Sequence, residues 1–172
     1  MHSKNTPAST VALGGVLAAL AVSIMWLGGL LGIATYVAPM LCALLLQVVK
    51  SACGSRLGWA WYSAVAILSL LLVAEREEAW VFVFLGYYPL VKPWLDKRRL
   101  RLVWKGLLFN GSVFLLYGLL IFVLGVPELV QEFRGLGAVM LVVLLLLGNV
   151  TFFLLDKLLE KPFFGKLGRH GV

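Results

Sequence analysis

The amino-acid sequence predicts an all-α membrane protein, a bundle of six transmembrane helices with both termini in the cytoplasm. Of its 172 residues, 62% are hydrophobic and only 13% are charged, whereas soluble proteins average about 25% charged. The apolar residues fall into runs long enough to cross a bilayer, and the basic residues gather at alternate ends of these runs. One membrane domain over residues 1–172 follows, because no interval between the runs is long enough for a soluble domain.

The first two spans come from one long charge-free run, from Val11 to Val49. As a single helix it would be about 58 Å long, nearly twice the roughly 30 Å thickness of the hydrocarbon core. The three glycines within residues 28–32 weaken a helix and permit a turn. We therefore predict spans over residues 11–27 and 33–49.

Four further apolar runs follow, each bounded by charged or turn-forming residues. A polar break at residues 50–56 precedes the first of them, and the acidic run 75–78 follows it. The predicted spans cover residues 57–74, 79–92, 106–126 and 136–155. Each must be helical, because lipid offers no hydrogen-bond partner to an exposed backbone.

The distribution of charge predicts the orientation of the spans. Thirteen of the fifteen basic residues fall on one side, and only Arg76 and Arg134 fall on the other. The positive-inside rule places the richer side, and both termini, in the cytoplasm. The basic residues sit at the ends of apolar runs and not along one face, which favours contact with the lipid bilayer and gives no indication of nucleic-acid binding.

The fourth span contains the predicted kink and anchor. Only 13 uncharged residues separate Glu78 from Lys92, about 20 Å of helix, so Lys92 should lie at the inner boundary of the bilayer. Its ammonium group either reaches the cytoplasmic interface or pairs with Asp156. Pro89 lacks an amide hydrogen and crowds the carbonyl of Leu85, so the helix should kink or unwind about one turn before Lys92.

Two tyrosines precede this proline. Tyr87 and Tyr88 point to adjacent faces, and at least one hydroxyl should turn inward, since a phenol in lipid has no partner. The alternative is that both belong to an interfacial aromatic belt.

Amides and small residues mark possible contacts between helices. Asn110 and Asn149 lie within spans, where an amide either joins neighbouring helices or contributes to a ligand site. In the first span Gly15, Ala19 and Ser23 recur every four residues and form a small-residue stripe that permits close contact with a partner helix. The spacing leaves open whether that helix is internal or belongs to another protein.

Enzymatic chemistry has little support in the sequence. The histidines, His2 and His170, lie in the tails, so neither is expected to serve as a base or metal ligand at membrane depth. The sequence shows no nucleophile elbow and no phosphate-binding glycine loop. Cys42 and Cys53 occur singly, which argues against a disulfide or metal site. We expect no catalytic residue, no metal and no cofactor.

In its size, its six predicted spans, its cytoplasmic termini and the Gly15, Ala19, Ser23 stripe, the chain resembles an S component of energy-coupling-factor vitamin transporters. The stripe stands in place of that family's alanine-x-x-x-alanine pattern. The run Gly86-Tyr87-Tyr88-Pro89-x-x-Lys92 is also similar to a pattern in small bacterial membrane proteins.

The S-component resemblance implies a multi-pass subunit of the bacterial cytoplasmic (inner) membrane that captures a small solute from the outer side. It also implies docking onto a transmembrane coupling subunit driven by ATPases. The expected substrate-binding residues are Trp26, Tyr36, Trp80, Tyr87, Tyr88 and Asn149, and the pocket is expected to include residues near Glu128 and Glu132. Each tryptophan and tyrosine has an alternative explanation as an interfacial anchor.

A non-transporting scaffold or accessory subunit, acting through helix–helix contacts, is the alternative function. An outward cavity with several inward polar groups would favour solute capture. Polar groups bonded only to one another would favour the scaffold.

Overall fold

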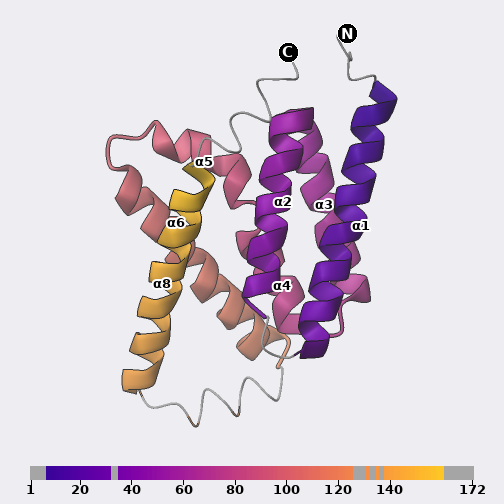
Figure 1. Cartoon of the computed structure of the whole chain (residues 1–172). Coiled ribbons are helices and arrows are strands. Elements are labelled where there is room, and N and C mark those ends of the chain that lie inside the picture. The colour runs from indigo at the N-terminus through magenta and orange to yellow at the C-terminus, as the bar shows by residue number, and fades with distance from the viewer. Residues whose placement is uncertain (1–6, 32–34, 126–130, 132–134, 136–137, 161–172) are drawn as a thin grey trace. The chain divides into compact units, whose positions relative to one another are not determined.

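The computed structural model describes residues 7–31, 35–125, 131, 135 and 138–160 (Figure 1). Within these residues the regular elements are helical and no strand occurs, which confirms the predicted all-α class. The elements are α1 (Pro7–Leu31), α2 (Val37–Cys53), α3 (Ser55–Leu72), α4 (Arg76–Leu85), α5 (Tyr88–Asp96), α6 (Arg101–Gly118), the π-helical η1 (Leu119–Val123) and α8 (Ala138–Glu160).

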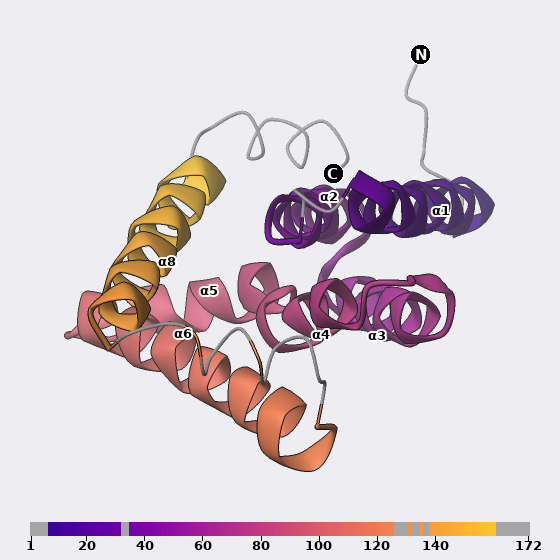
Figure 2. The same cartoon turned by 90° about the horizontal axis from the view of Figure 1, so that it is seen from below.

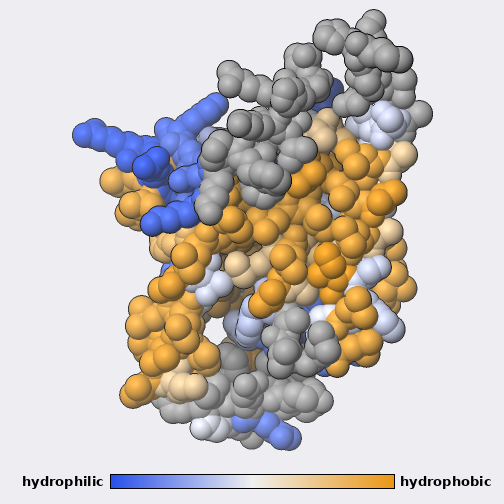
Figure 3. Space-filling view, viewed as in Figure 1, coloured by the Kyte–Doolittle hydropathy of each residue, from blue (hydrophilic) through white to orange (hydrophobic). Residues whose placement is uncertain are grey.

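The helices have the length and surface of membrane spans. In the part of the chain that the structure describes, four segments are long and apolar enough to cross a bilayer, and α2 is a shorter apolar helix. The four segments are Ser9–Leu30, Ser55–Leu72, Arg101–Val123 and Val139–Glu160. Large apolar side chains are exposed along them, among them Leu71 and Phe122, and Figure 3 shows apolar residues over most of the visible helical surface. A membrane-embedded protein follows, whereas the six-span topology stays a prediction.

The chain divides into two compact units. Unit 1 comprises residues 1–94 and 159–172, and unit 2 comprises residues 95–158. The prediction of a single membrane domain over residues 1–172 stays a prediction.

Unit 1 is built from two layers of helices. In Figure 2, α1 and α2 lie side by side in one layer and α3 and α4 form the second. Each layer packs on the other through α1 with α3 and through α2 with α4. Met25, Cys42, Leu46, Val65 and Phe82 are fully buried where these helices meet. Burial of these apolar side chains against one another holds the four helices together.

The α1 helix is longer than the predicted first span. It continues through Gly28 and Gly29 to Leu31, whereas a turn was expected over residues 28–32. A methyl group on Gly29 would lie 3.2 Å from Cγ of Glu75, so this glycine lets the segment before α4 approach α1. Its role is close packing, and the helix tolerates it because neighbouring helices support the backbone.

The predicted fourth span is broken into two helices. The α4 helix ends at Leu85, Gly86 and Tyr87 form a turn, and α5 begins at Tyr88. Pro89 therefore lies in the first turn of α5, where an amide donor is not needed. The hydroxyl of Tyr62 donates to the carbonyl of Val83, which would have paired with residue 87 in an unbroken helix. The predicted interruption of this helix is confirmed.

A second proline lies inside α5, at Pro93. It has no amide hydrogen to donate to the carbonyl of Pro89 four residues earlier. The ammonium group of Lys50, from α2, donates to that carbonyl at 2.6 Å. A side chain from another helix thus replaces the hydrogen bond that the proline removes.

In unit 2, α6 and α8 pack through aromatic rings and a glycine. The rings of Phe109 and Phe152 stack with centroids 4.7 Å apart. Gly148 faces Phe109, whose ring lies 3.4 Å from where a methyl group on the glycine would stand. The α6 helix begins at Arg101, five residues before the predicted span, and α8 runs to Glu160, five residues beyond its predicted end. Lys105 and Asp156, which were expected at or beyond the ends of spans, thus lie inside helices.

Candidate functional site

The residues predicted to bind a solute are distributed over both units. Asn149 belongs to unit 2 and the aromatic residues belong to unit 1. Those in unit 1 are Trp26 on α1, Tyr36 before α2, Trp80 on α4, and Tyr87 and Tyr88 at the break between α4 and α5. Two residues expected near them, Glu128 and Glu132, lie outside the described residues.

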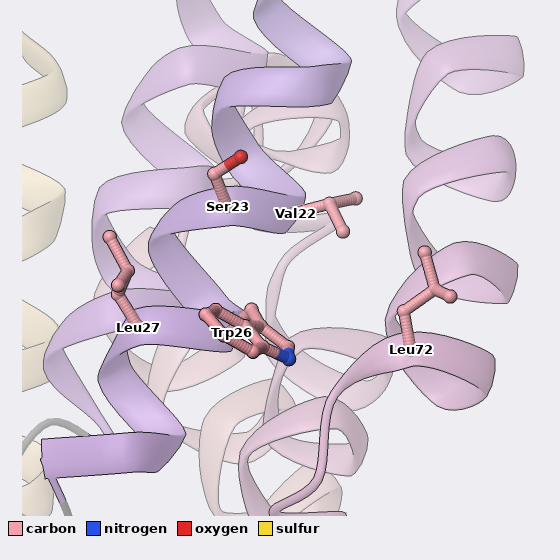
Figure 4. A pocket seen from close by; sticks show the side chains of 5 residues that line it. All are labelled: Val22, Ser23, Trp26, Leu27 and Leu72. Carbon is pink, nitrogen blue, oxygen red and sulfur yellow. The ribbon is translucent and has the colours of Figure 1, made fainter.

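An open hollow of about 470 Å³ lies beside α1 and α3 (Figure 4). Val22 and Trp26 point from α1 toward Leu72 of α3. Trp26 is 46% exposed, and Ser23 supplies a hydroxyl group. The described residues that line the hollow are Val22, Ser23, Trp26, Leu27 and Leu72. This lining is mostly apolar, so it suits an apolar group better than a charged one.

Tyr36 and Trp80, two more aromatic residues of the predicted solute site, make contacts elsewhere. The hydroxyl of Tyr36 donates to Oε1 of Glu77 at 2.8 Å, and the ring of Trp80 lies 6.1 Å from that of Phe84. Neither is among the described residues that line the hollow. Their positions leave the aromatic part of the predicted solute site to Trp26.

Tyr87 and Tyr88 serve the break between α4 and α5. Tyr88 is 1% exposed, and the ring of Tyr87 meets the ring of Tyr62 edge-on at 6.1 Å. Both tyrosines therefore contribute to packing within unit 1. A fully buried Tyr88 does not fit an interfacial aromatic belt.

Asn149 forms a reciprocal pair with Asn110 in unit 2. Each Nδ2 donates to the Oδ1 of the other asparagine at 3.0 Å. Each also donates at 2.8 Å to a carbonyl four residues earlier in its own helix. The two amides satisfy one another and join α6 to α8, as amides between membrane helices do.

Two ion-paired lysines lie in and after α5, the helix that follows the break after α4. Lys105, only 1% exposed, lies 2.6 Å from Asp96 and 2.8 Å from Asp156. Lys92 lies 3.3 Å from Glu160. The pairing of Lys92 with Asp156 stays a prediction, and Lys105 also lies opposite Asp156 because α6 begins before the predicted span.

Sequence analysis missed the residue that stands out most in unit 1, Glu78. Its side chain is 0% exposed, and neither of its carboxylate oxygens has a hydrogen-bond partner in the part of the chain that the structure describes. The sequence places it in the acidic run 75–78 that separates two predicted spans. Its position next to the apolar run that begins at Ala79 was the available signal, since the last acid before a span is the one nearest the membrane interior.

Three residues close to Glu78 explain its electrostatic environment. One of its oxygens lies 3.3 Å from where a methyl group on Gly29 would stand, and Glu75 approaches the same glycine. Burial, assisted by the negative charge of Glu75, raises the pKa of Glu78 to about 7. The buried thiol of Cys42, on α2, is close enough to Glu78 to interact with its charge. The carboxyl group thus lies among α1, α2 and α4.

The small-residue stripe of α1 faces away from the core of unit 1. Gly15, Ala19 and Ser23 are all exposed, and a methyl group on Gly15 would meet no atom within 4 Å. The buried face of α1 is formed by other residues, among them Ala21 and Met25. The contact predicted for this stripe is therefore not made within the described part of unit 1.

In the described segments, no group of three or more histidine, cysteine, aspartate or glutamate side chains is placed to hold a metal ion. The expected absence of catalysis, metals and cofactors stays a prediction. In comparisons with known proteins, no family model, curated protein or solved structure matches this chain.

Proposed function

We propose that this protein is an integral membrane subunit that binds a transmembrane helix of a partner protein along the Gly15, Ala19, Ser23 stripe. The observation that carries the proposal is the division of α1 into two faces. One face is buried in unit 1, while the stripe is exposed. Small residues every four positions let two helix backbones approach closely, which is a source of affinity between helices in lipid.

The polar contacts favour this function over capture of a polar solute. Asn110 pairs with Asn149, Lys105 with two aspartates, and Lys50 with a backbone carbonyl. Groups satisfied in this way contribute to packing and leave few donors for a ligand. The scaffold or accessory role considered from the sequence is therefore our first choice.

Solute capture is the second candidate, and the hollow beside Trp26 is the observation that favours it. It uses the same helix, because α1 carries both the hollow and the stripe. In this form of the proposal the partner would be a coupling subunit associated with ATPases, as the resemblance to S components implies. A ligand that stabilises the wild type but not Trp26→Ala in thermal-shift screening would favour capture.

The partner contact is tested with a matched pair of variants. Ala19→Leu adds bulk to the stripe and should reduce recovery of the partner about tenfold or more, since it prevents close backbone approach. Ala64→Leu adds the same bulk at an exposed position of α3 and should leave recovery unchanged. The measurement is photo-crosslinking from position 16, an exposed residue of α1 beside the stripe, in native membranes of the wild type and of each variant, followed by mass spectrometry.

Both variants should retain the thermal stability of the wild type, because both positions are exposed. Equal recovery of the partner from the wild type and Ala19→Leu, or crosslinking to lipid alone in the wild type, would contradict the proposed contact.

A further inference from the structure

Glu78 is a buried acid for which neither the fold nor the proposed function accounts. It is fully buried at the start of α4, and both of its carboxylate oxygens lack a hydrogen-bond donor among the described residues. An ionised carboxylate in such a place loses its hydration without compensation. The group must therefore be neutral or must hold a cation.

The helices packed on α4 bring no positive charge to this carboxyl group. The α1 segment 7–31 has no titratable side chain, and α2 presents the thiol of Cys42. Tyr62, from α3, is engaged with the carbonyl of Val83, and Lys50 is engaged with Pro89. The remaining ionisable groups of α3 and the start of α4, Arg56 and Arg76, are exposed.

The neighbouring acids make ionisation less favourable. Methylene groups of Glu75 and a carboxylate oxygen of Glu78 approach the same glycine, Gly29, and the negative charge of Glu75 favours a proton on Glu78. Glu77 accepts a hydrogen bond from Tyr36 and so has a partner of its own. Among the described residues, no group of three or more acidic, histidine or cysteine side chains is placed to hold a metal ion.

From this geometry we propose that Glu78 is a proton-binding site, loaded from the end of unit 1 at which α1 ends and α4 begins. The proton neutralises the carboxyl group and removes the cost of burying it. The pKa of about 7 for Glu78 supports this assignment, because the site then exchanges its proton near neutral pH. The proposal goes beyond partner binding and does not depend on it.

Proton binding has a defined effect on stability. The pKa of Glu78 is raised above its ordinary value of 4.5, so the folded state holds the proton more tightly than the unfolded state. Its contribution to stability is complete below about pH 4.5 and is lost as the pH rises through about 7. Deprotonation also adds repulsion between the negative charges of Glu78 and Glu75, which disfavours the contact between α4 and α1.

The test uses infrared spectra and thermal unfolding of the purified full chain in lipid nanodiscs between pH 5 and 9. The wild type should show a protonated carboxyl absorption at pH 6 that disappears near pH 7 to 8. Glu78→Gln keeps the shape of the neutral acid, so it should fold, lack this absorption and unfold at a temperature that depends less on pH.

Glu77→Gln is the matched control and should retain both the absorption and the pH dependence of the wild type. Loss of the absorption in Glu77→Gln with retention in Glu78→Gln would overturn the proposal. So would an unfolding temperature that depends on pH equally in the wild type and Glu78→Gln. Each titration is repeated with sodium in place of choline, and displacement of the proton by sodium would overturn the assignment of a proton as the ligand.

Discussion

At the scale of single residues, Gly86 shows how space alone can require a glycine. Its φ of −63° is ordinary for any residue, so backbone freedom is not the reason. A methyl group at this position would lie 2.5 Å from the carbonyl oxygen of Phe82 and 2.6 Å from its ring. The turn between α4 and α5 therefore closes tightly only because residue 86 has no side chain.

Gly86→Ala should lower the free energy of unfolding by about 1–3 kcal/mol, since a methyl group would force Phe82 out of the core of unit 1. Gly111→Ala is the control, because a methyl group there meets no atom within 4 Å and alanine favours the helix. The measurement is the thermal unfolding midpoint of each variant in the same detergent. Equal midpoints for both variants would show that the turn relaxes without cost.

At the scale of elements, Lys105 connects three helices of the chain. It lies on α6, and its partners Asp96 and Asp156 lie at the end of α5 and on α8. All three residues belong to unit 2. A buried ion pair adds little to stability compared with apolar side chains in place of both partners. Removal of the cation alone is costly, because it leaves a buried negative charge uncompensated.

Lys105→Met should destabilise the protein by about 3–5 kcal/mol, because Asp156 then loses the ammonium group that lies 2.8 Å from it. The double variant Lys105→Met, Asp156→Leu should recover part of that loss, whereas Lys97→Met, at an exposed position, should change little. The comparison is made by denaturant unfolding in mixed micelles. A double variant no more stable than the single one would mean that the pair does not act through buried charge.

The interrupted helix was predictable because proline has one clear effect on a helix, namely the loss of a donor. Glycine was less informative. The pair at Gly28 and Gly29 is compatible with a turn or with close packing, and only the position of Glu75 in space decides between them. The partner of Lys105 was equally beyond sequence analysis, because pairing between distant helices depends on where each helix begins and ends.

At the scale of the whole molecule, composition predicted the all-α class and the membrane environment, since both follow from long apolar runs. The helices in the described residues differ from the predicted spans mainly at their ends. There the helices continue beyond the predicted limits and include charged residues such as Arg101 and Lys157. Of the candidate site, Trp26 was predicted and Glu78 was missed. Burial of one carboxyl group among several in a short acidic run is a property of packing and not of composition.

The orientation in the membrane is a prediction that labelling can test. The test uses Ser55→Cys and Ala74→Cys, each made in a Cys53→Ser background, because both positions are exposed. The remaining cysteine, Cys42, is fully buried. The positive-inside rule places residue 74 outside and residue 55 inside. An impermeant maleimide added to intact cells should therefore label Ala74→Cys and leave Ser55→Cys unlabelled until the membrane is opened. The reverse pattern would invert the topology.

The bond from Lys50 to the carbonyl of Pro89 has a consequence for the order of assembly. The chain makes α2 before α5, and the two residues are 39 positions apart. Because α5 contains a carbonyl that its own backbone cannot satisfy, it becomes stable in lipid only beside a completed α2. We therefore expect the nascent chain to keep α2 close to the point of insertion until α5 emerges, so that the two helices pack together as they are made.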